Sequence, residues 1–529
     1  MTTPSFTKGS VLAQALTEAQ IECEVLWPND AEYTARVQSY WSQQARLQPA
    51  CIVRPRSASE VSTVVKTLAN KKVQFAVRSG GHTPHAGANN INNGVTIDLS
   101  LLNWTRFDAA SETVDLGPGG RWRDVYSELD KHGRIVAGGR NGTVGVGGLI
   151  LGGGISFSTG RRGFTCDDVI SFEVVLADGR IVTATADEYS DLFFALKGGS
   201  NNFGIVTNYK MHALKSDGIF GGLKIYPKQV TPQATEALVR FTASVESDPD
   251  SHMLWFHTYT GEFDAASGRM STTPDFKDIV VVVAIAQLAG IADAPAYHGF
   301  KELPAIMDTC KQTTVLGGVS EYDVSPGDHQ STFYTATFAN DARIVAKATE
   351  LHERLVNDLK ALIPDGDFTT QCLLQPLPKA YGQTSARNGG NVMGVQNQRV
   401  DGLLFVAIVL LKTPAQQAFA YPRIRAWVAE LKAYAATIEN GNLDWVYLNY
   451  ADGSQDPLRS YGVENVRRMK LAAAKYDPDQ VFQKLCVGGF KISHVADEKI
   501  QSRLPQGSNP DGNRSWLGVV WDWLMPGRR

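Results

Sequence analysis

The sequence has few cysteines for its length, and none of them forms a CxxC pair. This absence argues against zinc fingers, against other metal sites and against thioredoxin-type redox chemistry. Six thiols in 529 residues are also too few for a disulfide scaffold. We therefore expect buried thiols in a reducing compartment, with a Cys23–Cys51 bridge only if the chain is exported.

Basic residues show neither a surplus nor a run. The chain has 51 Lys and Arg against 54 Asp and Glu, a formal net charge of -3. Binding to nucleic acid or to an acidic membrane surface would need a basic stripe, so both classes of partner are excluded. The 43% hydrophobic and 20% charged residues are ordinary for a globular protein.

Long apolar runs are missing as well. Ile279–Ala286 and Leu403–Leu411 are the longest, and both are far shorter than the roughly 20 residues that span a bilayer. The first 20 residues lack a basic region followed by an apolar one, so they predict a short amphipathic helix and a cytoplasmic protein. The aromatic stretch Trp516–Met525 is expected to cap the core.

Two familiar nucleotide motifs are absent, but glycine is dense in two places. There is no Walker A motif, and Ile150 stands where the third glycine of GxGxxG would be. Instead, Val77–Thr83 follows an expected strand with two adjacent glycines, and Gly138–Gly148 continues to Gly152–Gly154. Such segments cost conformational entropy, and a chain tolerates them where backbone approaches another backbone, a phosphate or a flat ligand.

Four motifs, in order along the chain, resemble one known family. They are Arg78-Ser79-Gly80-Gly81-His82, Thr143–Gly148, Gly199–Thr207, and a C-terminal set formed by Tyr447–Tyr450, Tyr461-Gly462, Asn465 and Tyr476-Asp477-Pro478. Together they resemble the vanillyl-alcohol oxidase, or PCMH-type, FAD-binding family, and most closely its berberine-bridge-enzyme-like branch. The resemblance covers about residues 45–490.

The resemblance implies FAD bound covalently through the 8α position to His82. It further implies cofactor contacts from residues of the glycine-rich loops and their surroundings: Arg78, Ser79, Gly80, Gly81, Thr83, Asn141, Thr143, Gly145, Val146, Gly148, Gly204, Val206 and Asn449. Many branch members carry a second, cysteinyl link at the position of Asn141, so we expect a single histidyl link here. Leu149 replaces a histidine that is frequent in the branch, and Val146 occupies a position thought to gate oxygen.

The expected fold class is α+β, a two-domain PCMH-type FAD-binding fold. The substrate domain is expected to be an antiparallel sheet covered by helices, because long strands alternate with long helices after residue 219. The predicted boundaries are an N-terminal helical segment at 1–44, the FAD-binding domain at 45–215, the substrate-binding domain at 216–445, a C-terminal segment returning to the FAD domain at 446–500, and a tail at 501–529.

Candidate catalytic residues come from two expected strands. Alternation along Leu443–Tyr450 places Tyr447 and Asn449 on one face, and the resemblance gives the matching tyrosine a place beside the substrate. Alternation along Met253–Tyr259 places His257 on a face with two other aromatic residues, where it could act as the base.

The resemblance implies an FAD-dependent oxidoreductase that is similar to the fungal FAD-linked oxidases of secondary metabolism, in particular an oxygen-using oxidase of a small polyketide or alkaloid. Its partners would be the small-molecule substrate and dioxygen. Three alternatives stay open at this point. They are a sugar or oligosaccharide oxidase, an oxidase that also directs (or only performs) a cyclisation, and a flavin-free binding protein.

Overall fold

Three larger β-sheets, one two-stranded sheet and the helices between them form the part of the chain that the structure describes. This computed structural model describes residues 22–260, 278–321 and 329–496, so the predicted N-terminal helix and the Trp516–Met525 tail lie outside the described residues. Among the helices it describes, none is long and apolar enough to cross a membrane. All six cysteines are free, so the chain has no Cys23–Cys51 bridge.

The first sheet has the strand order β1-β2-β4-β3. Strands β2, β4 and β3 are parallel, and β1 pairs antiparallel with β2 at the edge. Helix α3 connects β2 to β3, and it begins at a Ser57 cap, whose hydroxyl accepts from the Glu60 amide at 3.2 Å. The strand bounds are β1 Glu24–Leu26, β2 Cys51–Arg54, β3 Phe75–Arg78 and β4 Val95–Asp98, and helices α2 and α3 span Ala31–Gln38 and Ala58–Asn70.

The second sheet is antiparallel, in the order β5-β6-β10-β8-β9. Its β8–β9 hairpin turns at Asp178-Gly179, as the sequence predicts, because a glycine at φ +82° suits a tight turn. The bounds are β5 Thr105–Asp108, β6 Thr113–Leu116, β8 Val169–Val175, β9 Ile181–Ala184 and β10 Ile205–His212, with β7 Arg134–Ile135 paired to β11 Leu214–Lys215 outside it. The helices are α4 Trp122–Asp130, α5 Val146–Leu151, α6 Thr159–Arg162 and α7 Ser190–Leu196.

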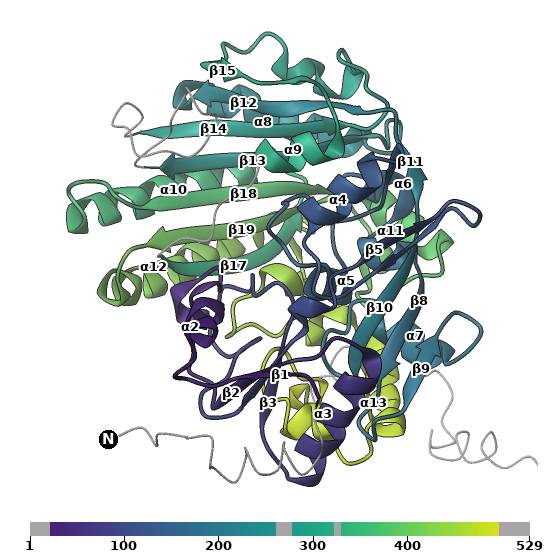
Figure 1. The fold of residues 1–529 in the computed structure, drawn as a ribbon. Helices are drawn as coiled ribbons and strands as arrows, with labels where there is room; N and C mark the ends of the chain where they lie inside the picture. The colour runs from purple at the N-terminus through teal and green to yellow at the C-terminus, as the bar shows by residue number, and fades with distance from the viewer. Residues whose placement is uncertain (1–21, 261–277, 322–328, 497–529) are drawn as a thin grey trace, which may run out of the picture. The chain divides into compact units, whose positions relative to one another are not determined.

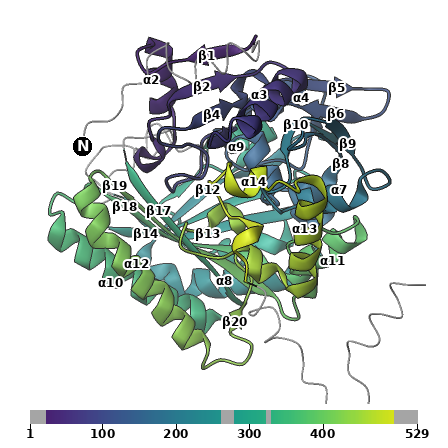
Figure 2. The same ribbon diagram turned by 90° about the horizontal axis from the view of Figure 1, so that it is seen from below.

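The third sheet has nine antiparallel strands, ordered β15-β12-β14-β13-β18-β19-β17-β20, with β16 also paired to β12. In Figures 1 and 2 helices α8, α10 and α12 lie together against one face of this sheet. The predicted α+β class, with an antiparallel sheet covered by helices, is confirmed. The strands are β12 Ile219–Pro227, β13 Ser251–Thr260, β14 Ile279–Gln287, β15 Met307–Asp308, β16 Lys311–Thr313, β17 Gln330–Ala339, β18 Thr369–Leu377, β19 Gly402–Leu411 and β20 Asn442–Leu443; the helices are α8 Thr231–Ser244, α9 Val315–Glu321, α10 Ala342–Leu362, α11 Lys379–Arg387 and α12 Pro414–Ala435.

One predicted strand is wrong. Only Asn442–Leu443 pairs with β17, and the chain then turns into a 3₁₀ helix at Leu448–Tyr450. The third sheet ends at this edge, so nothing keeps the segment extended. The strand β18, which contains Pro376, was not predicted.

The chain returns to the first sheet after the third sheet is complete. Helix α13 (Val463–Tyr476) leads to α14 (Val481–Lys484), and the Phe75 amide donates to the Leu485 carbonyl at 2.9 Å. The rings of Phe482 and Phe75 meet edge to face, with centroids 6.1 Å apart, inside one hydrophobic core. Residues separated by about 400 positions therefore share that core.

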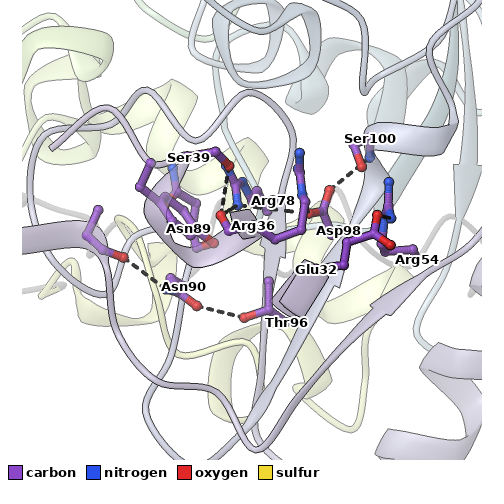
Figure 3. Close-up of polar contacts among 12 residues, drawn as sticks. Glu32, Arg36, Ser39, Arg54, Arg78, Asn89, Asn90, Thr96, Asp98 and Ser100 are labelled. Carbon is purple, nitrogen blue, oxygen red and sulfur yellow. Dashed lines mark hydrogen bonds and ion pairs between the residues drawn. The ribbon is translucent and has the colours of Figure 1, made fainter. Parts of the chain in front are cut away.

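A buried ion cluster fastens α2 to the first sheet just before the first glycine loop. Figure 3 shows Arg36 and Arg78 beside Asp98, which is fully buried at the end of β4. Arg36 donates to Asp98 through Nε and Nη2 at 2.9 and 2.7 Å, while Arg78 lies 3.9 Å away. Burial alone would raise the pKa of Asp98, but both guanidinium groups and the Ser100 amide hold it below the usual value.

Replacing Asp98 by Asn should destabilise the protein by about 3–5 kcal/mol, because two guanidinium groups then lose their buried counter-charge. A carboxyl group whose pKa is lowered by folding stabilises the protein at pH values above its unfolded pKa of about 3.9. The loss of stability in Asp98→Asn should therefore be complete at pH 7 and shrink as the pH falls below about 4. Urea unfolding at both pH values measures this deficit.

The matched control is Glu32→Gln, which removes the charge of a half-exposed carboxylate that forms an ion pair with Arg54. A loss below about 1 kcal/mol is expected there. Equal losses for the two variants would contradict the ion-cluster interpretation.

Candidate functional site

The two glycine-rich loops touch each other backbone to backbone. A Cβ atom on Gly80 would lie 2.5 Å from the amide nitrogen of Gly145, and a Cβ on Gly145 would lie 2.4 Å from that of Gly80. Gly81 adopts φ +67°, which favours glycine. The Ser79 hydroxyl accepts from the Gly147 amide at 3.2 Å and so joins the two loops a second time. The predicted approach of backbone to backbone is present.

A cavity of about 550 Å³ opens between these loops and the third sheet. Most of the sequence-predicted site residues line it: Ser79, Gly80, Gly81, His82, Thr83, Asn141, Gly145, Gly148, Gly204, Val206, Tyr447 and Asn449. Gly148 faces open space, since a Cβ there would meet no atom within 4 Å. The fold thus gathers residues from positions 79 to 449 around one volume.

Three of the predicted cofactor residues lie behind the cavity wall rather than on it. Arg78 lies below the first loop, where its Nε would be 2.9 Å from a Cβ on Gly81. Its guanidinium lies over the Tyr40 ring at 3.7 Å and donates to the Arg36 carbonyl. Val146 is fully buried, and its Cγ2 would lie 3.5 Å from a Cβ on Gly120. Thr143 is the third of these residues, and its hydroxyl contacts Nε2 of His82.

His257 does not join the other site residues, so the sequence-based role as base needs correction. Strand alternation on β13 is as predicted, but the face that carries His257 packs against helix α10. There its Nδ1 lies 2.8 Å from Nδ1 of His352. The opposite face, with Leu254 and Phe256, lines the cavity. Burial lowers the pKa of His257 to about 3, so it is a neutral core residue.

His82 is held in one orientation at the cavity wall. Its ring stacks on Trp41 with centroids 4.9 Å apart and planes 20° apart. Its Nε2 lies 3.2 Å from the Thr143 hydroxyl, which in turn lies 2.6 Å from Oδ1 of Asn141. Burial, followed by the charge of Arg121, lowers the pKa of His82 to about 3. The imidazole is therefore neutral at physiological pH and keeps a lone pair.

Tyr447 and Asn449 meet through the 3₁₀ turn rather than by strand alternation. Asn449 Nδ2 donates to the Tyr447 hydroxyl and to the Leu149 carbonyl, both at 3.1 Å. A Cβ on Gly152 would lie 2.0 Å from Asn449 Oδ1, so this glycine makes room for the amide. Burial and the neighbouring Tyr450 raise the pKa of Tyr447 well above its ordinary value.

Arg140 and Tyr450 are cavity residues that the sequence analysis did not select. Arg140 Nη2 donates to the Tyr450 hydroxyl at 3.0 Å and to Gln375 Oε1 at 2.7 Å, and Nη1 lies 2.8 Å from His252 Nε2. No carboxylate in the described ranges pairs with this buried guanidinium. Strand alternation would place Tyr450 on the opposite face from Tyr447, whereas the turn brings their ring centroids to 4.9 Å.

The sheet contributes an apolar wall. Eleven of its side chains on the lining are hydrocarbon: Leu223, Ile225, Leu254, Phe256, Val280, Val282, Ala284, Phe333, Leu373, Ile408 and Leu410. Polar lining from the sheet is confined to Thr258, Thr260, Thr369 and Gln371. The wall therefore suits an apolar molecule with few polar groups.

Comparison with known proteins identifies the first half of this site. The family described as FAD binding domain matches residues 49–185, which contain both glycine-rich loops. Among solved structures, 6-hydroxy-D-nicotine oxidase from Arthrobacter nicotinovorans superposes with a TM-score of 0.70 at 20% identity, over 88% of this chain and 97% of that one. Glucooligosaccharide oxidase from Acremonium strictum superposes with a TM-score of 0.69 at 18% identity, over 89% and 98%. The PCMH-type fold is thereby confirmed.

The residues present fit FAD. The crossing of Gly80 and Gly145 leaves a wall of bare backbone, which a Cβ would fill. Trp41 Nε1 and His85 Nδ1 are buried in cavity-lining residues and have no hydrogen-bond partner within the described part of the chain. A flat cofactor with carbonyl and phosphate oxygens supplies the acceptors that such a site requires.

Replacing Gly145 by Ala should abolish FAD loading, because the new methyl group would force the two loops apart. The ratio of flavin to protein absorbance in the purified variant measures the effect. Gly120→Ala is the matched control, since its Cβ would meet only ordinary contacts at 3.4 Å or more. Normal loading in Gly145→Ala would show that the loops tolerate separation.

Full-length relatives complete the comparison. An FAD-dependent monooxygenase of Aspergillus calidoustus is 37% identical over 488 residues, covering 91% of this chain and 90% of its own. The bifunctional solanapyrone synthase of Alternaria solani is 32% identical, covering 92% and 90%. With these identities over nine tenths of its length, and with the FAD-binding loops in place, the chain belongs to the PCMH-type FAD-dependent oxidoreductases of fungal secondary metabolism.

Proposed function

We propose that this protein is an oxidase that dehydrogenates a largely apolar secondary metabolite, such as a polyketide or alkaloid intermediate, with FAD linked through His82. The observation that carries the proposal is the single cavity whose walls are the two FAD loops on one side and the apolar sheet face on the other. Substrate and cofactor would share this space, so the reacting atoms can approach directly.

The substrate class follows from the composition of the sheet face. An oligosaccharide presents hydroxyl groups along its length and needs many polar partners, because each unpaired buried hydroxyl costs free energy. The eleven hydrocarbon side chains of the wall supply none. Arg140 is the charged exception near the loops, and it suits a single polar or anionic group on an otherwise apolar molecule. The sugar-oxidase alternative is therefore not favoured.

Tyr450 is the residue best placed to take a proton from the substrate. Its side chain is half-buried on the cavity wall, and its hydroxyl accepts a hydrogen bond from Arg140 at 3.0 Å. This contact directs the Arg140 guanidinium at the oxygen that would receive the proton. Tyr447 is less suited, because it is buried and burial opposes its ionisation. Tyr447 and Asn449 would instead shape the cavity beside Leu149.

The proposed reaction is balanced in electrons and protons. Bound FAD would accept a hydride from a substrate carbon and pass two electrons to dioxygen, which leaves as hydrogen peroxide. Tyr450 would act as its phenolate, accept the proton from the substrate hydroxyl or amine and release it to solvent, which supplies the protons of hydrogen peroxide. The apolar wall would exclude water and fix the carbon that loses the hydride.

The link through His82 is supported by its place on the lining and by its neutral, oriented ring. The glucooligosaccharide oxidase of similar fold carries a 6-S-cysteinyl, 8α-N1-histidyl FAD. Here Asn141 stands at the position expected for the cysteine, so one bond is proposed rather than two.

Flavin should stay with the wild-type polypeptide after acid precipitation and be lost from His82→Ala. In-gel flavin fluorescence and the mass of the intact protein measure the link. His85→Ala is a comparison variant, because His85 also lines the cavity but lies outside the proposed bond. Release of all flavin from the wild type by acid would contradict the covalent link, whereas a protein that never binds flavin would contradict the whole proposal.

Tyr450→Phe should lower kcat by roughly 10²–10⁴-fold, the usual contribution of a positioned base, with flavin content unchanged. Tyr447→Phe should lower kcat much less. The assay is peroxide release with hydroxylated polyketides and alkaloids, with oligosaccharides as the contrast. Turnover of oligosaccharides alone would overturn the substrate class. Incorporation of ¹⁸O from dioxygen into product would instead favour monooxygenation, the activity after which several relatives are named.

A further inference from the structure

The cavity face of the third sheet offers hydrogen-bonding groups at two separated places along strand β18. Gln375 contacts Arg140 at one place, and Gln371 lies on the same face, four residues away, at the other. We propose that the substrate is an elongated chain whose oxygen-bearing, reacting end lies at Arg140 and Tyr450 and whose far end is an uncharged hydroxyl bound by Gln371. The inference rests on the proposed function and adds to it the length and polarity of the substrate.

Strand geometry sets the distance between the two places. Gln375, Leu373 and Gln371 follow one another on the cavity face of β18, and four residues of a strand span about 13 Å. The guanidinium of Arg140 marks one end of this span, because its Nη2 donates to Gln375 Oε1 at 2.7 Å. An extended peptide covers about 3.6 Å for every three backbone bonds, so an extended carbon chain needs roughly ten to twelve bonds for the same span.

The lining between the two places is hydrocarbon. In the antiparallel register Leu373 lies beside Phe256 on β13, and Phe256 lies beside Val282 on β14. Figure 1 shows these three strands side by side in the middle of the sheet. Leu254 and Ala284, which face each other in the same register, continue the wall toward the FAD loops. A methylene chain gains free energy by burial here, whereas a polar group in the middle of the chain would lose its hydrogen bonds.

Gln371 is the residue at which this hydrocarbon wall ends. Its side chain is half-buried on the cavity lining, and its amide has no hydrogen-bond partner among the residues that the structure describes. The neighbouring Thr258 hydroxyl donates to the Thr370 carbonyl at 3.1 Å and so offers only lone pairs to the cavity. A ligand hydroxyl can accept from Gln371 Nε2 and donate to Thr258, whereas a ligand carbonyl can make only the first of these contacts.

The two ends of the span differ in charge. The lining around Gln371 consists of Thr258, Thr369, Leu373 and Ile408, none of which is charged, so an ionised group there would lack a counter-ion.

At the other end the buried guanidinium of Arg140 donates to Gln375 and Tyr450, and no carboxylate of the described ranges pairs with it. An acidic group on a chain therefore binds at Arg140, where Tyr450 stays protonated beside it, and the neutral hydroxyl binds at Gln371. The charge difference fixes the direction in which the chain enters.

The test measures how saturated fatty acids of about 4 to 16 carbons, and their ω-hydroxy forms, bind to the FAD-loaded protein. The carboxyl carbon has no hydrogen to give as hydride, so the change in flavin absorbance reports binding alone. At each length the Kd of the plain acid is divided by the Kd of its ω-hydroxy form, which isolates the effect of the hydroxyl. This ratio should peak at about 10 to 12 carbons, roughly three- to tenfold above its value at either end of the series, the gain from one hydrogen bond.

Variants of β18 should change this profile in predictable ways. Gln371→Leu should remove the peak and leave plain acids bound at least as tightly as in the wild type. Combining Gln371→Leu with Leu373→Gln moves the amide about 7 Å toward Arg140, so the peak should move to chains about six carbons shorter. Thr369→Val is the matched control, because this residue lies on the same face beyond Gln371, and it should keep the wild-type profile.

A wild-type profile without a peak, or a peak that survives in Gln371→Leu, would overturn the inference. If the double variant loses its flavin, the wild-type series and Gln371→Leu still decide the matter. Peroxide release separates this inference from the proposed function. Peroxide formation without a peak in the binding series would overturn the inference alone. A peak that disappears in Gln371→Leu, in a protein that releases no peroxide with any hydroxylated substrate, would overturn the oxidase function and leave the two polar ends of the site in place.

Discussion

The contact between the backbones of Gly80 and Gly145 is the constraint from which the rest of the site follows. Because no Cβ fits at either position, the loop after β3 and the start of α5 touch backbone to backbone. His82 follows Gly80 by two residues and Thr143 precedes Gly145 by two, so the same crossing brings these two side chains within hydrogen-bonding distance. The contact between His82 and Thr143 therefore depends on the lack of side chains at Gly80 and Gly145.

A second close approach works in the same way on the other side of the cavity. Gly152 leaves space for Asn449, whose amide donates to the Leu149 carbonyl three residues earlier in the loop. The turn at Leu448–Tyr450 is thereby fixed to the FAD loops, and Tyr450 reaches Arg140, which lies within the second of them. The loops position both the cofactor residues and the proposed base, although these come from opposite ends of the sequence.

The sequence predicted local features well and relations between elements less well. The sequence pattern of Ala342–Leu362 predicts the helix found there and the Asp178-Gly179 pair predicts the observed hairpin, because both signals are local. Alternation on β13 correctly placed His257 with Trp255, but alternation does not reveal which face of a strand meets the helices. The Leu443–Tyr450 strand failed because a partner strand, rather than propensity, decides whether such a segment stays extended. The sequence analysis did not select Arg140, because the side chains that it contacts lie more than 100 positions away in the sequence.

The return of the chain to its first sheet has a consequence for biosynthesis. Phe75 packs on Phe482, and its amide is bonded to Leu485, so the first hydrophobic core is incomplete until nearly the whole polypeptide has left the ribosome. Contacts of such long sequence separation form late, after the third sheet has been translated. The sheet that carries the first FAD loop is therefore completed only after α14 has been synthesised.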